Sequence, residues 1–152
     1  MLIKTHLVIS LFAILVLLPF VNSKIVFIVV ALLATYIPDI DAPESKFGSK
    51  FYFRPLQWFV KHRGFLHSFS FLFLVSLIFV LFIPQLALGF FLGYGLHILL
   101  DSFTIQGVQI FYPFKRRISG KIRTGSLLET GFFVVFLVLD LVLTIYTFKS
   151  IF

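Results

Sequence analysis

The sequence predicts an all-α, polytopic membrane helix bundle. Of its 152 residues, 60% are hydrophobic and only 12% are charged, and the mean hydropathy is +1.09. A soluble domain of this length does not need so much apolar surface. The apolar residues also form long stretches with few or no charges, as membrane helices do. We count five such spans, at residues 7–20, 25–37, 69–83, 86–100 and 131–147, within a single membrane-embedded domain of residues 1–152.

The basic residues are distributed unevenly between the two ends of these spans. Eleven of the 13 Lys and Arg residues lie near the N-terminus or in the loops after the second and fourth spans, and only Lys24 and Lys149 lie on the other side. Basic residues are enriched on the cytoplasmic side of membrane proteins. The net charge of +7 is therefore attributed to topology, and no nucleic-acid partner is predicted.

The first span begins next to His6 and closes at Pro19. A histidine just inside a membrane helix is costly, so it is either an interfacial, solvated side chain or part of a site. An alternative interpretation makes residues 1–23 a cleaved signal peptide, because a basic residue, an apolar run and small residues follow one another.

The second span ends at Pro38-Asp39-Ile40-Asp41. Proline stops the helix, and the following segment is expected to be extended. Carboxylates separated by one residue in an extended segment point to opposite sides. One of the two acids could then bind a metal while the other binds a second metal or a basic side chain. The alternative is a turn with two solvated acids.

Residues 44–61 combine polar and aromatic side chains and predict a short amphipathic helical segment in the headgroup region, with Trp58 as an interface anchor. His62 and His67 follow, before the third span. Five residues apart, they are separated by about 140° on a helix and cannot share one face. We therefore place His62 in a loop that bends at Gly64, and His67 in the first turn, so that both imidazoles turn toward one point.

The fourth span carries Gly89, Gly93, His97 and Asp101 at intervals of four along one face. The two glycines predict a groove where another helix approaches closely. His97 and Asp101 are four residues apart, a spacing that lets two side chains of one helix coordinate the same ion. The alternative is a hydrogen-bonded histidine with no ligand role.

The loop after the fourth span contains Lys115, Arg116 and Arg117 with no acid among them. Topology alone explains these charges, and the alternative is a site for an anionic headgroup or phosphate. Glu129 follows, at the positive N-terminal end of the last span. Asp140, in the middle of that span, is unexplained.

All four histidines and five of the six acids fall at one end of the predicted bundle, which scattered structural histidines would have no cause to do. Imidazole and carboxylate groups without thiolates, in a chain with no cysteine, suit zinc, manganese or iron, and the set is large enough for two ions. The candidate metal ligands are His6, Asp39, His62, His67, His97 and Asp101.

The sequence resembles the YdjM-like membrane-bound metal-dependent hydrolases, some of which are described as LexA-regulated inner-membrane proteins. The matching stretches are Thr5-His6, residues 38–41, 62–68, 93–101 and 125–129. The resemblance implies a polytopic membrane protein with a metal centre and hydrolase activity. A weaker similarity, in the order of the histidines and the His-xxx-Asp step, links the chain to zinc phospholipase C and P1-type nucleases. Their N-terminal tryptophan and second His-xxx-Glu helix are absent here, so the similarity does not extend to a three-zinc site.

The predicted function is hydrolysis of a phosphoester or a lipid-linked phosphate at the cytoplasmic membrane surface. A divalent ion, with zinc favoured, would make water a nucleophile at neutral pH. Asp41 or Glu129 would take the proton, and Arg63 would stabilise the developing negative charge. The alternatives are a non-enzymatic metal-binding or ion-transporting membrane protein, and a scaffold with a polar packing cluster. Membrane lipid is the expected partner.

The uneven distribution of basic residues makes a testable prediction about topology. The N-terminus and both long loops should be cytoplasmic and the C-terminus external. A reporter that works only outside the cytoplasm should therefore be active when fused after Phe152, and one that works only in the cytoplasm should be inactive. Reporter activity in the cytoplasm would contradict the predicted orientation.

Overall fold

The computed structural model describes residues 1–42, 50–54, 58 and 63–151. These residues form five α-helices: α1 (Ile3–Leu17), α2 (Lys24–Tyr36), α4 (Phe69–Phe82), α5 (Pro84–Ser102) and α6 (Leu127–Ile151). Three short 3-10 helices accompany them: η1 (Leu18–Phe20), η2 (Pro38–Asp41) and η3 (Phe51–Phe53). The all-α prediction is confirmed, and each predicted span corresponds to one of the helices.

Two of the described helical segments are long and apolar enough to cross a membrane by length and composition. They are Ile3–Phe20, with a mean hydropathy of 2.1, and Leu127–Thr147, with 2.2. α2 has 13 residues and α4 has 14, which corresponds to about 20 Å of helix against a hydrocarbon core of about 30 Å. The first and last of the five predicted spans are thus supported, and the three central ones stay predictions.

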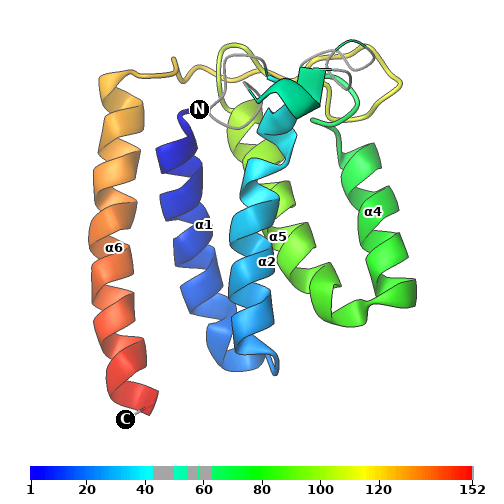
Figure 1. Ribbon diagram of the computed structural model, residues 1–152. Helices are drawn as coiled ribbons and strands as arrows, with labels where there is room; N and C mark the ends of the chain where they lie inside the picture. The colour runs from blue at the N-terminus through cyan, green and yellow to red at the C-terminus, as the bar shows by residue number, and fades with distance from the viewer. Residues whose placement is uncertain (43–49, 55–57, 59–62, 152) are drawn as a thin grey trace.

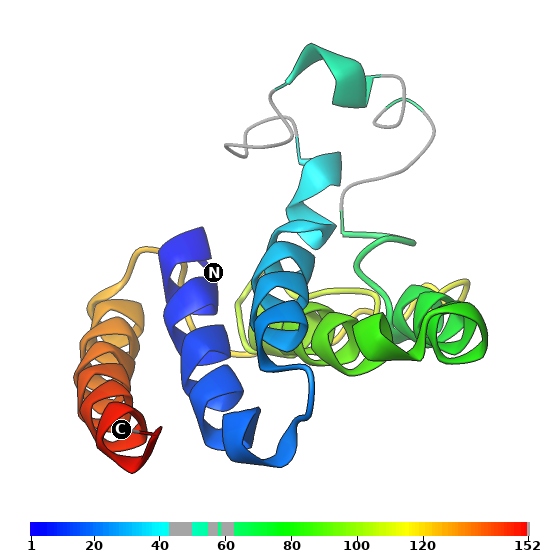
Figure 2. The ribbon, with the colours of Figure 1, turned by 60° about the horizontal axis from the view of Figure 1, so that its bottom comes forward.

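The polar ends of the helices lie together at one end of the molecule. In Figure 1 the N-terminus, the starts of α4 and α6 and the ends of α2 and α5 all lie at the top, and the C-terminus lies at the bottom. α6 packs against α1, while α5 packs against α2 and α4. The view in Figure 2 shows α6 at the opposite side of the structure from α4. The common end on which the predicted site depends is therefore present.

The contact between α2 and α5 depends on glycine. A Cβ atom added to Gly93 would lie 2.0 Å from the carbonyl oxygen of Ala31, and one added to Gly89 would lie 3.0 Å from that of Phe27. No side chain fits at the first distance without moving the two backbones apart. The predicted groove for a neighbouring helix is thus confirmed, and the neighbour is α2.

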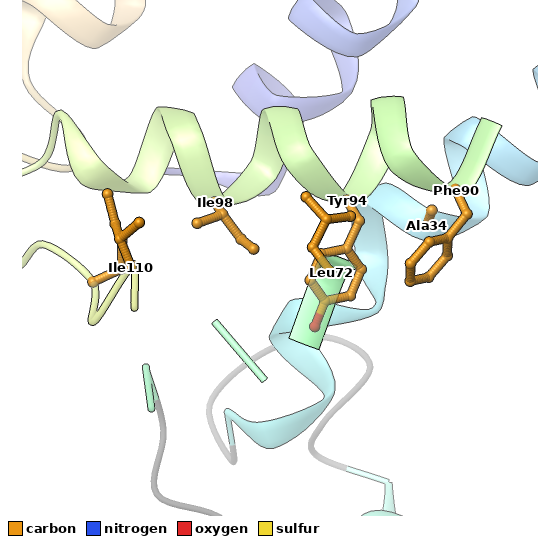
Figure 3. Packing of buried hydrophobic residues seen from close by; sticks show 7 residues of the cluster. Ala34, Leu72, Phe90, Tyr94, Ile98 and Ile110 are labelled. Carbon is orange, nitrogen blue, oxygen red and sulfur yellow. The ribbon is translucent and has the colours of Figure 1, made fainter. Parts of the chain in front are cut away.

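The apolar core lies between α2, α4 and α5. Leu72, Phe90, Tyr94 and Ile98 are buried there and pack together (Figure 3). The hydroxyl of Tyr94 donates a hydrogen bond to the carbonyl oxygen of Leu66, in the turn before α4. This bond satisfies the one polar atom of a buried ring and holds the turn that carries His67 against α5.

The segment between α5 and α6 folds back over the end of α5. Isolated bridges pair Thr104 with Ile122 and Val108 with Ile118. Of the predicted interfacial segment at 44–61, only residues 50–54 and 58 lie within the described residues. Trp58 is 81% exposed there, and its role as an interface anchor stays a prediction.

The close approach at Gly93 gives a prediction with a matched control. Gly93→Ala should destabilise the protein by about 1–3 kcal/mol, because the added methyl group overlaps the backbone of α2. Gly131→Ala should leave stability nearly unchanged, since a Cβ at this helical glycine of α6 meets nothing within 4 Å. Thermal unfolding in detergent measures both variants. Equal melting temperatures would show that α2 and α5 are not packed through Gly93.

Candidate metal centre

Asp39 and Asp41 approach the same imidazole. Asp39 Oδ1 lies 3.9 Å from His67 Nε2, and Asp41 Oδ2 lies 3.3 Å from His67 Nδ1. The prediction of an extended segment with the two acids pointing apart is wrong. The residues form the 3-10 helix η2, whose tight turn carries both carboxylates round the ring of His67.

His97 is held in one orientation by α2. Its Nδ1 lies 2.7 Å from the carbonyl oxygen of Thr35. A carbonyl oxygen only accepts, so Nδ1 carries the hydrogen and the neutral ring presents the lone pair of Nε2. That atom is buried and makes no hydrogen bond to any described residue. It lies 3.6 Å from Asp39 Oδ1.

His6 brings α1 into the same cluster. Its ring stacks on that of His97, with the centroids 4.0 Å apart and the planes within 6°. His6 Nε2 lies 3.3 Å from Asp101 Oδ1, yet neither ring nitrogen has a hydrogen-bond partner in the described part of the chain. His6, His67 and His97 are completely buried. Three imidazoles from three different parts of the chain thus share one water-poor site.

The geometry fits a divalent ion. Two groups have all their ligand atoms within 4.8 Å of one another: His6 with His97 and Asp101, and Asp39 with His67 and His97. Two ligands about 2 Å from one tetrahedral zinc ion lie about 3.3 Å apart, close to the spacings observed here. A lone pair of His97 facing a carboxylate is repelled by it, and a cation between the two replaces repulsion with coordination. His97 belongs to both groups and offers one free nitrogen, so it can serve one ion.

The pKa values of two groups outside the five α-helices follow from this packing. Burial raises the pKa of the Asp39 carboxyl, but the nearby histidines outweigh burial and lower it to about 2. Burial disfavours a charge on His67, yet the carboxylates of Asp39 and Asp41 raise the pKa of its imidazole to about 9. His67 is therefore protonated at pH 7 without an ion, and coordination through this ring must displace that proton.

Arg63 lies beside the histidine cluster, as predicted, in the segment before α4. Its Nη2 is 3.1 Å from Asp101 Oδ2, and its Nη1 is 3.2 Å from the carbonyl oxygen of Gly107. The chain bends at Gly64, as the sequence predicts, and the preceding residue, Arg63, adopts the left-handed conformation with φ at 61°. The bend turns the guanidinium toward Asp101, and His67 lies in the turn before α4 rather than inside the helix. His62 lies outside the described residues.

Glu129 lies in the first turn of α6, as predicted, and ties the start of the chain to that helix. It accepts hydrogen bonds from the backbone N–H of Leu2 at 2.6 Å, from Thr5 Oγ1 at 3.0 Å and from the N–H of Gly125 at 2.6 Å. These contacts are structural and occupy both carboxylate oxygens. Of the two predicted proton acceptors, Asp41 is the one in contact with a histidine of the cluster.

Some contributors to the site carry no sequence signal. The carbonyl oxygen of Thr35 orients His97, but any residue type has such an oxygen. The side chain of Thr35 also donates to Ser10 at 3.1 Å, joining α2 to α1 beside the site. The α-amino group of Met1 contacts Asp101. Asp101 therefore has cationic partners besides any bound ion.

The comparisons with known proteins agree with the predicted family. The family described as YdjM inner membrane protein matches residues 1–151. The chain belongs to the YdjM family. It is therefore an inner membrane protein, as the sequence predicts, while the orientation in the membrane stays a prediction.

The chain is similar to two known relatives over part of its length. It is 40% identical over 96 residues to the inner membrane protein YdjM of Escherichia coli (strain K12), and the match covers 57% of this chain and 49% of that protein. It is 32% identical over 99 residues to the uncharacterized protein YvsG of Bacillus subtilis (strain 168), covering 61% of this chain and 62% of that protein. The match thus spans about half the length of the Escherichia coli relative. No solved structure matches the chain.

Removal of His97 should separate a metal site from helix packing. His97→Ala should lower zinc affinity by more than about 100-fold, since loss of a supporting group alone costs about 10–100-fold. Asp140→Asn is the matched control, because Asp140 is also buried and its carboxylate oxygens have no hydrogen-bond partner within the described residues. Zinc content of the purified variants measures the effect. Equal zinc in wild type and His97→Ala would leave helix packing as the role of this residue.

Proposed function

We propose that this chain is a membrane-bound metal-dependent hydrolase that acts on a phosphoester at the cytoplasmic membrane surface. The observation that carries the proposal is the lone pair of His97 Nε2, held by Thr35 and aimed at Asp39 inside a cluster of buried imidazoles. Such a cluster is costly to bury without a function, because its polar atoms lose water and gain few hydrogen bonds.

The donor set favours zinc over the other candidates. It consists of imidazole nitrogens and carboxylate oxygens, which zinc accepts in hydrolytic sites, and the chain offers no thiolate. Manganese and iron accept the same donors and are the alternatives. A bound divalent ion supplies Lewis acidity and makes water a nucleophile near neutral pH. His97 would hold it either with Asp39 and His67 or with His6 and Asp101.

The remaining residues have distinct roles in the proposal. Asp41 contacts His67 Nδ1 and orients the ring, as carboxylates commonly do for metal-binding histidines. In the proposal, Asp41 also accepts the proton that the attacking water loses. Arg63 stabilises negative charge on the phosphoryl group. Its guanidinium pairs with Asp101, while its Nε makes no hydrogen bond to any described residue. This buried donor lacks a partner in the described part of the chain, and in the proposal it binds a phosphate oxygen.

Hydrolysis of bis(p-nitrophenyl) phosphate by the purified protein tests the proposal. Activity should disappear on treatment with a chelator and return with zinc. Arg63→Gln should keep its metal and lower kcat by about 100-fold, the usual cost of losing one group that stabilises transition-state charge. Arg123→Gln, which alters an exposed loop arginine, is the matched control and should behave as wild type.

The same experiment distinguishes the hydrolase from a non-enzymatic metal-binding or ion-transporting protein. A protein that binds zinc stoichiometrically but hydrolyses neither this diester nor the monoester p-nitrophenyl phosphate contradicts the hydrolase proposal. The metal-binding or ion-transporting interpretation would then replace it.

A further inference from the structure

A cavity of about 290 Å³ lies between α1, α5 and α6, next to the metal-binding cluster. Its lining is apolar and comes from all three helices and from the segment that follows α5: Met1, Ile9, Leu100, Phe103, Ile122, Phe132 and Phe136. None of these residues takes part in the proposed chemistry.

The cavity lies next to the cluster, with Met1 between them. Met1 lines the cavity, and its α-amino group contacts Asp101. Leu100 lines the cavity and directly precedes Asp101 on α5. On the α1 side, Ile9 lies one turn beyond His6. A molecule that fills the cavity therefore has one end beside Asp101 and His6.

The position of the cavity indicates what fills it. Two of its walls, α1 and α6, contain the two described segments that pass the test for a membrane span. Phe136 contacts Phe12 edge to face, with centroids 5.2 Å apart, and so joins these two helices at the cavity wall. The outward face of α6 is apolar, with Val135, Leu139 and Val142 exposed toward the surroundings. In a membrane the apolar ligand at hand is a lipid acyl chain.

The charged groups just beyond the apolar lining indicate the headgroup, because Met1 of the lining contacts Asp101. Arg63 pairs with Asp101 and keeps its Nε donor without a hydrogen bond among the described residues. Guanidinium groups match phosphate oxygens in geometry and charge. We infer that the α1–α5–α6 cavity binds the acyl chain of a phosphate-bearing membrane lipid, with the phosphate at Arg63 and the histidine cluster. The inference rests on the proposed hydrolase function, for which it names the substrate class.

Binding to metal-free protein tests this inference without hydrolysis. The probe is phosphatidic acid with a diazirine at the end of one acyl chain, added to the purified chain in detergent after chelator treatment. Photolysis should label the peptides that contain Ile9, Phe132 and Phe136. Unlabelled phosphatidic acid should compete, whereas diacylglycerol, which has chains but no phosphate, and inorganic phosphate, which has no chain, should each compete at least 10-fold less well.

Variants that fill the cavity give the second measurement. Ile9→Trp and Ile122→Trp should each reduce labelling by about 10-fold, because the larger ring occupies the space of the chain. Leu141→Trp is the control, since Leu141 is 59% exposed on α6 and does not line the cavity. Melting temperatures show which variants remain folded, and the labelled positions in wild type decide the question if neither cavity variant folds.

Two results would overturn the inference. Labels spread over the exposed faces of α4 and α6, with no preference for the cavity, would show that the probe contacts only the protein surface. Equal competition by diacylglycerol and phosphatidic acid would remove the phosphate from recognition. Each can occur while bis(p-nitrophenyl) phosphate is still hydrolysed, so failure of lipid binding is distinct from failure of the hydrolase proposal.

Discussion

The hydrogen bond from His97 to the carbonyl oxygen of Thr35 is the interaction on which the candidate site depends. It forms because α2 and α5 lie in backbone contact at Gly93, one turn before His97. The bond fixes the tautomer and directs Nε2 toward Asp39, at the end of α2. The orientation of the His97 lone pair therefore depends directly on the packing of α2 against α5. A larger residue at Gly93 would disturb both.

Much of the fold could be predicted from the sequence because helices that enter a bilayer must be long runs of apolar residues. Apolar runs locate the helices, and the glycine spacing on the fourth run locates a close contact. What failed was local backbone geometry. The turn at residues 38–41 is a 3-10 helix rather than an extended segment, and His67 lies in the turn before α4 rather than in the first turn of that helix. At residues 38–41, the contacts of the two carboxylates with His67 outweigh the local preference for an extended segment.

The candidate site was predictable in its residue types and less so in its roles. The histidines and acids had to converge once the spans alternated in direction, and His6, Asp39, His67, His97 and Asp101 do meet. The parts played by their neighbours depend on geometry that no spacing encodes. Asp41 orients an imidazole, Glu129 secures the start of the chain to α6, and Asp101 is paired with Arg63 as well as His6. Asp140 has no explanation in the structure.

X-ray absorption spectroscopy of the purified protein loaded with one equivalent of zinc shows whether the buried histidines coordinate an ion. We expect a single ion in a shell of nitrogen and oxygen atoms at about 2.0–2.1 Å, with the outer scattering of at least two imidazole rings. Folded protein that retains no zinc, or zinc surrounded by water oxygens without imidazole scattering, would contradict the claim that these buried histidines form a metal centre.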